Sequence, residues 1–141
     1  MTTIEYKGEK FMFAPDVQGP VSNRTLEIIN EEKPQLIMMG GPPLYLSGFR
    51  GNENQIKAGL NNLEKVVKIV PNVILEHHIL RDDNWRDNIK NVFDVADEVG
   101  CKILTVAEFL SKENAFLAKL PRMGKLAFFF ACLKWTPNKV F

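Results

Sequence analysis

The sequence contains little cysteine and little histidine. Its 141 residues include two cysteines, Cys101 and Cys132, which are too few to form a disulfide framework. The N-terminal segment, residues 1–5, lacks the basic and then apolar layout of a secretory signal peptide. Together these features predict a protein of a reducing compartment, and we expect a cytoplasmic location.

Long apolar runs and an excess of one charge are also missing. The most apolar run, residues 126–133, is far shorter than the roughly 20 residues that span a bilayer. Its three successive phenylalanines do not fall on one helical face, which disfavours binding to a membrane surface. A formal net charge of +1 gives no reason to expect nucleic acid as a partner. The sequence therefore predicts neither a membrane nor a nucleic-acid partner.

The chain has the size of one domain and alternates strand and helix patterns. Runs rich in β-branched and apolar residues predict strands at 2–6, 10–14, 35–39, 73–76 and 101–104. Apolar spacing predicts helices from Ser22 or Asn23 to Pro34, over 53–70, from about Asp83 to Gly100, and from Thr105 onward. This order predicts an α/β fold in which an N-terminal hairpin is followed by βαβαβα units with right-handed crossovers.

Two helix ends carry specific signals. Gly100 is placed to end its helix as a left-handed C′ residue. Thr105 and Glu108 have the spacing of a capping box, in which each side chain satisfies a free backbone N–H of the first helical turn.

Polar side chains follow two of the predicted strands. Asp16 comes just after strand 10–14, and His77, His78 and Asp82 follow strand 73–76. Parallel strands end at one edge of a sheet, so we expect Asp16 and at least one histidine to lie close together. Imidazole and carboxylate suit zinc, manganese or iron. The alternative is structural: Asp16 stabilises the turn before Gly19, His77 lies in the core, and His78 is exposed.

Four segments resemble, in order, an uncharacterised archaeal family of metallo-β-lactamase-like hydrolases. They are residues 13–20, 40–43, 74–82 and 105–110, and the resemblance covers about residues 4–116. It implies half of an αββα sandwich, with metal ligands at one edge between the two sheets. It further implies that Asp16 bridges two metal ions and that His77 or His78 completes the shell of one of them.

The resemblance also implies a chemistry. Two ions about 3.5–4 Å apart activate a water and clamp the oxygens of a displacement, as in ester or phosphodiester hydrolysis. Glu76 or Asp82 would orient a histidine. Arg81 would bind an anionic substrate or pair with Asp82. Gly40 and Gly41 are candidates to lie near the substrate; they lack the Gly-x-Gly-x-x-Gly layout, which disfavours a nucleotide site.

The sequence departs from that family in two places. The His-x-His-x-Asp-His motif of the superfamily does not occur among the 15 residues before Asp16. Residues 119–141 are basic and aromatic, where the family continues with an acid-containing helical segment. We therefore expect residues 1–118 to be the C-terminal half of such a domain and 119–141 to be a divergent tail, as a truncated and frameshifted gene would produce. Alone, such a chain should bind metal weakly and hydrolyse little.

A half-sandwich would leave one sheet face without its partner layer. We expect Phe11, Phe13, Ile37, Met39, Ile74 or their strand neighbours to contribute to an apolar surface there. The chain should then self-associate, aggregate or cover that face with its own tail at Phe128 to Phe130. Pairing with the missing N-terminal half is a further possibility.

Two other functions remain open. One is a manganese phosphoesterase of the Asp-His-His type, which Glu76-His77-His78 resembles with one extra methylene. The other is a non-enzymatic half-domain that serves in interaction or regulation.

Overall fold

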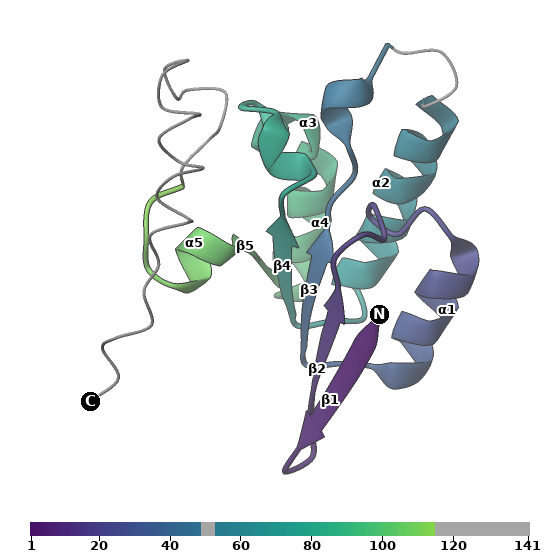
Figure 1. The fold of residues 1–141 in the computed structure, drawn as a ribbon, viewed down its shortest axis with the longest axis vertical. Helices are drawn as coiled ribbons and strands as arrows, with labels where there is room; N and C mark the ends of the chain where they lie inside the picture. Colours follow the sequence, from purple (N-terminus) through teal and green to yellow (C-terminus); the bar gives the residue numbers. More distant parts are fainter. Residues whose placement is uncertain (49–52, 115–141) are drawn as a thin grey trace, which may run out of the picture.

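The computed structural model describes residues 1–48 and 53–114, which form a five-stranded sheet with helices (Figure 1). The strands are β1 (Thr2–Tyr6), β2 (Glu9–Ala14), β3 (Leu36–Gly40), β4 (Asn72–Glu76) and β5 (Lys102–Thr105). They lie side by side in chain order, with β1 antiparallel to β2 and the others parallel. The expected α/β class, opening hairpin and strand order are confirmed. The tail 119–141 lies outside the described residues.

The longer helices lie on one face of this sheet (Figure 1). They are α1 (Asn23–Glu32), α2 (Glu53–Val67) and α4 (Lys90–Val99). Right-handed crossovers between successive parallel strands place every connecting helix on the same side. Shorter elements are η1 (Leu44–Leu46), η2 (Ile79–Arg81), α3 (Trp85–Asn88) and α5 (Val106–Phe109), which contacts β4 and β5. No helix within the described ranges is long and apolar enough to cross a membrane.

The helix-end signals are confirmed. Gly100 ends α4 with a φ of 75°. The Glu108 backbone N–H donates to Thr105 Oγ1 over 3.1 Å, and the Thr105 N–H donates to the Glu108 carboxylate over 2.9 Å. Burial alone would raise the pKa of Glu108, but the hydrogen bonds from Thr105 and Arg86 outweigh burial and lower it.

The single helix expected from Asp83 to Gly100 is wrong. It divides into α3 and α4 at Ile89, whose φ of −116° and ψ of 26° depart from helical values. The Asp82 carboxylate accepts hydrogen bonds from the Asn84 backbone and the Asn88 side chain, at 2.9 and 2.7 Å, and so fixes the first turn separately. Apolar spacing could not reveal this break, since Trp85 and Ile89 are both buried in the core.

The register decides which strand residues face the helices. Residues paired across neighbouring strands point to the same face, and two such rows are buried in the core: Met12, Ile37, Val73 and Ile103, and Ala14, Met39, Leu75 and Thr105. The expectation that Ile37 and Met39 belong to an uncovered face is therefore wrong. Phe11, Phe13 and Ile74 do lie on the opposite face. Ile74 is only 4% exposed, however, so the expectation that it contributes to an uncovered surface is wrong as well.

Candidate metal centre

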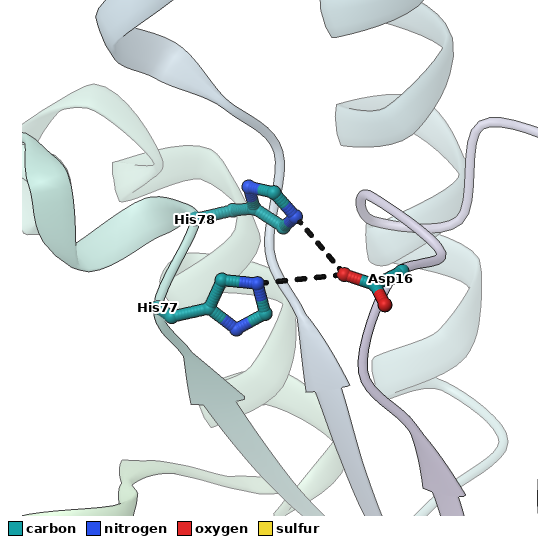
Figure 2. A group of neighbouring side chains, drawn as sticks. All are labelled: Asp16, His77 and His78. Carbon is teal, nitrogen blue, oxygen red and sulfur yellow. Dashed lines mark ion pairs between the residues drawn. The ribbon is translucent and has the colours of Figure 1, made fainter.

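Asp16 and the two histidines meet at the carboxyl edge of the sheet. Asp16 is the second residue after β2, and His77 and His78 directly follow β4. Strand β3 lies between these two strands and runs parallel to both. The three side chains therefore reach toward one another across the end of β3 (Figure 2).

Gly40, at the end of β3, makes this approach possible. A Cβ at Gly40 would overlap the carbonyl oxygen of Pro15 and would lie 2.9 Å from Cδ2 of His78. Gly41 is also crowded, because a Cβ there would lie 2.7 Å from Cβ of Ile79. The two glycines thus act through close packing: Gly40 lets the Asp16 loop and the His78 ring approach each other, and Gly41 accommodates η2.

Helix α2 contacts the loop that carries Asp16. Gln18 and Gly19 have φ values of 55° and 105°, which turn the chain sharply after Asp16. A Cβ at Gly59 of α2 would lie 2.5 Å from the Gln18 carbonyl oxygen, so the helix backbone touches this turn. The buried Asn62 side chain donates to the Pro20 carbonyl over 3.1 Å. The sequence analysis did not identify Gly59 and Asn62. The available signal was a small residue and a polar residue on the otherwise apolar face of an amphipathic helix.

One carboxylate oxygen faces both imidazoles. Asp16 Oδ1 lies 3.5 Å from Nε2 of His77 and 3.5 Å from Nε2 of His78 (Figure 2). One ligand atom from each of the three side chains lies within 4.8 Å of the others. In a tetrahedral zinc site, bonds of about 2.0–2.2 Å separate neighbouring ligand atoms by about 3.3–3.6 Å. The spacing at Asp16 therefore matches ligands of a common ion.

The two histidines have different surroundings. His77 Nδ1 lies 3.3 Å from the Glu76 carboxylate, so Glu76 is close enough to orient this ring in a metal-bound state. The His78 side chain is 15% exposed, and its Nδ1 is buried without a hydrogen-bond partner. Burial lowers the pKa of His78, with a smaller contribution from the charge of His77. The lowered pKa favours the neutral form of His78, the form in which imidazole binds metals.

The remaining candidates serve other contacts. Asp82 holds the start of α3 through its bonds to Asn84 and Asn88, so the structure gives it no contact with the histidines. Arg81 donates to the Tyr45 hydroxyl over 2.9 Å and stacks on that ring at 5.1 Å. In the described part of the chain, Arg81 thus pairs with Tyr45 of η1 instead of Asp82. The sequence did not predict this pairing, because Tyr45 and Arg81 lie 36 residues apart.

Comparisons with known proteins find similar proteins in archaea. This chain is 39% identical over 114 residues to a UPF0282 protein of Methanopyrus kandleri. The aligned region covers 81% of this chain and 38% of that protein. A UPF0282 protein of Pyrobaculum arsenaticum is 33% identical over 115 residues, or 81% of this chain and 36% of that protein. One from Korarchaeum cryptofilum is 32% identical over 104 residues, 74% of this chain and 35% of the relative.

No protein-family model and no solved structure matches the chain. The names of the relatives state neither a fold nor an activity. This chain is thus similar to archaeal UPF0282 proteins and spans little more than a third of their length.

Proposed function

We propose that this chain forms part of a metal-dependent hydrolase of the metallo-β-lactamase type, acting on an ester or phosphodiester. The observation that carries the proposal is the position of Asp16 Oδ1, 3.5 Å from Nε2 of both His77 and His78. The four segments that resemble such hydrolases support it, because two of them supply these three residues. The mixed sheet with its longer helices on one face supports it too, because each half of an αββα sandwich is a sheet covered by helices on one face.

Each residue of the cluster has a distinct role in this proposal. His77 and His78 would hold one ion through Nε2, with Glu76 beside Nδ1 of His77 to orient that ring. Asp16 would be the third ligand of this ion. The Asp16 side chain is 80% exposed, so its carboxylate would also be accessible to a second ion. Zinc, manganese or iron bound here would lower the pKa of a coordinated water and stabilise charge in the displacement.

Arg81 supplies a cation close to this edge. It belongs to η2, which begins directly after the histidines, and its charge contributes to lowering the pKa of His78. The Tyr45 hydroxyl and ring hold the guanidinium without neutralising it. We propose that Arg81 orients an anionic group of the substrate, as a planar guanidinium does with phosphate or carboxylate.

Three protein ligands are too few for a two-ion site. The relatives are more than twice as long as this chain, and we propose that residues outside the matched region complete the site in them. This chain alone should then bind a single ion weakly and show little turnover. Glu76 contacts His77 and lies outside the three-residue ligand group, so the structure adds nothing in favour of the Asp-His-His phosphoesterase.

Metal binding and hydrolysis are tested separately. Isothermal titration with zinc, manganese and iron(II) should show one site that Asp16→Asn weakens at least tenfold, because aspartate contributes a charged ligand. Asp97→Asn, an exposed position on α4, is the matched control and should leave binding unchanged. Equal affinity in both variants would remove Asp16 from the site.

The activity test uses the full-length Methanopyrus kandleri relative. With the metal that binds best, it should hydrolyse a chromogenic phosphodiester or ester and lose that turnover with chelator. Absence of turnover with all three metals, in a folded and metal-loaded protein, would overturn the hydrolase proposal while leaving the metal site standing.

A further inference from the structure

The face of the sheet opposite α1, α2 and α4 is apolar. Two rows of paired residues cross it: Thr2, Phe13, Met38, Ile74 and Leu104, and Ile4, Phe11, Leu36, Asn72 and Lys102. Seven of these ten residues are large apolar ones, as in a face that packs against another layer. In the part of the chain that the structure describes, α5 is the helix on this side, at the β4–β5 end (Figure 1).

The β1–β2 end of this face is open to solvent, whereas Ile74 in β4 is buried. Ile4 is 58% exposed, Phe13 is 40% exposed, and Tyr6 beside them is 71% exposed. Two hollows of about 210 Å³ each lie along it and share Leu36 as a lining residue. One extends to Leu104 and Phe109 of α5, and the other to Ile4 and Tyr6. Together they form a shallow apolar groove, called here the sheet groove, that runs across all five strands.

The described chain ends beside this groove. Helix α5 contacts β4 and β5, its Phe109 lines the groove, and the last described residue is residue 114. The apolar segment 126–133 begins 12 residues later in the sequence. Twelve residues reach up to about 40 Å, whereas five strands about 4.8 Å apart span only about 20 Å. Every part of the groove is therefore within reach of the segment.

We propose that residues 126–133 of the same chain bind in the sheet groove. The segment Leu-Ala-Phe-Phe-Phe-Ala-Cys-Leu carries no charge, and its phenylalanines supply a large apolar area that can cover the groove. A short tether gives the segment a millimolar effective concentration, which favours it over a second copy at ordinary protein concentrations. This inference does not depend on the metal site or on hydrolysis.

The native Cys132 allows a direct test in the full-length chain. In a Cys101→Ser background, Leu36→Cys in the middle of the groove and Leu104→Cys near α5 are each oxidised gently at low micromolar concentration. We expect a disulfide to Cys132 within one chain, seen by mass spectrometry of the monomer band and lost in Cys132→Ser. Asn61→Cys, exposed on α2 on the other side of the sheet, is the control and should cross-link at least tenfold less.

A second measurement protects against a variant that fails to fold. Replacing Phe128, Phe129 and Phe130 by serine leaves the sheet residues intact and should raise binding of an apolar fluorescent dye several-fold, with unchanged circular dichroism. Cross-links mainly between two chains would show that a second copy fills the groove and would overturn the proposal. Equal cross-linking from Asn61→Cys, or none from the groove positions together with unchanged dye binding, would overturn it as well.

Discussion

Gly40→Ala is the most informative single substitution at the metal centre. The new methyl group would enter the space between the Pro15 carbonyl and the His78 ring, on the two sides of β3 from which the ligands approach. The His78 ring must move from 2.9 Å to at least the 3.4 Å of ordinary contact, and the Pro15 carbonyl must move farther. Asp16, which follows Pro15, moves with it.

These displacements exceed what a metal site tolerates. Ligand distances are held within about 0.2 Å of their ideal values, whereas the ring alone must shift by about 0.5 Å. We expect zinc affinity to fall about 100-fold and the free energy of unfolding to fall by about 1–3 kcal/mol from overpacking. Titration of zinc against a fluorescent chelator measures the first quantity, and urea unfolding measures the second.

Gly41→Ala separates the two effects. Its methyl group would crowd Cβ of Ile79, so it should also lower the free energy of unfolding but change zinc affinity less than threefold. If Gly40→Ala binds zinc as tightly as the unsubstituted chain, the backbone approach at Gly40 does not position the ligands. If both variants lose affinity equally, the loss reflects general destabilisation of the strand ends.

Three further outcomes are expected. Glu76→Gln removes the charged acceptor behind His77 and should weaken zinc binding about 10–100-fold without unfolding the protein; unchanged affinity would leave Glu76 without a role there. Glu108→Gln keeps an oxygen that can accept from the Thr105 N–H but loses the charge that faces Arg86 at 2.7 Å, so it should lower stability at pH 7 by about 0.2–1 kcal/mol. Because the folded-state pKa of Glu108 is lowered, this difference should persist above its unfolded pKa and vanish as pH falls through the folded value in urea titrations. Burial raises the pKa of Cys101 to about 11, so in a Cys132→Ser chain the thiol should stay unreactive toward a disulfide reagent at pH 8 until denaturant is added; rapid labelling would contradict its burial.

Local signals in the sequence predicted most of the fold. The turn of the hairpin, the capping box of α5 and the end of α4 each depend on residues close together in the chain, such as Lys7-Gly8 and Gly100. The bounds of the strands were predicted within about two residues, because short apolar and β-branched runs bounded by glycine or proline are typical of buried strands. Asp16, His77 and His78 were selected because parallel strands deliver their ends to one edge.

The tertiary structure decided what depends on contacts between distant residues. Strand register buried Ile37 and Met39 beneath the helices. A shift of one residue exchanges the two faces of a strand, and the sequence pattern of this apolar strand did not reveal which face the helices cover. The role of Gly40 arises from Pro15 and His78, which lie 25 and 38 positions away on neighbouring strands. The sequence thus predicts which residues lie at the strand ends. The distances and contacts between those residues depend on how the strands pair and pack.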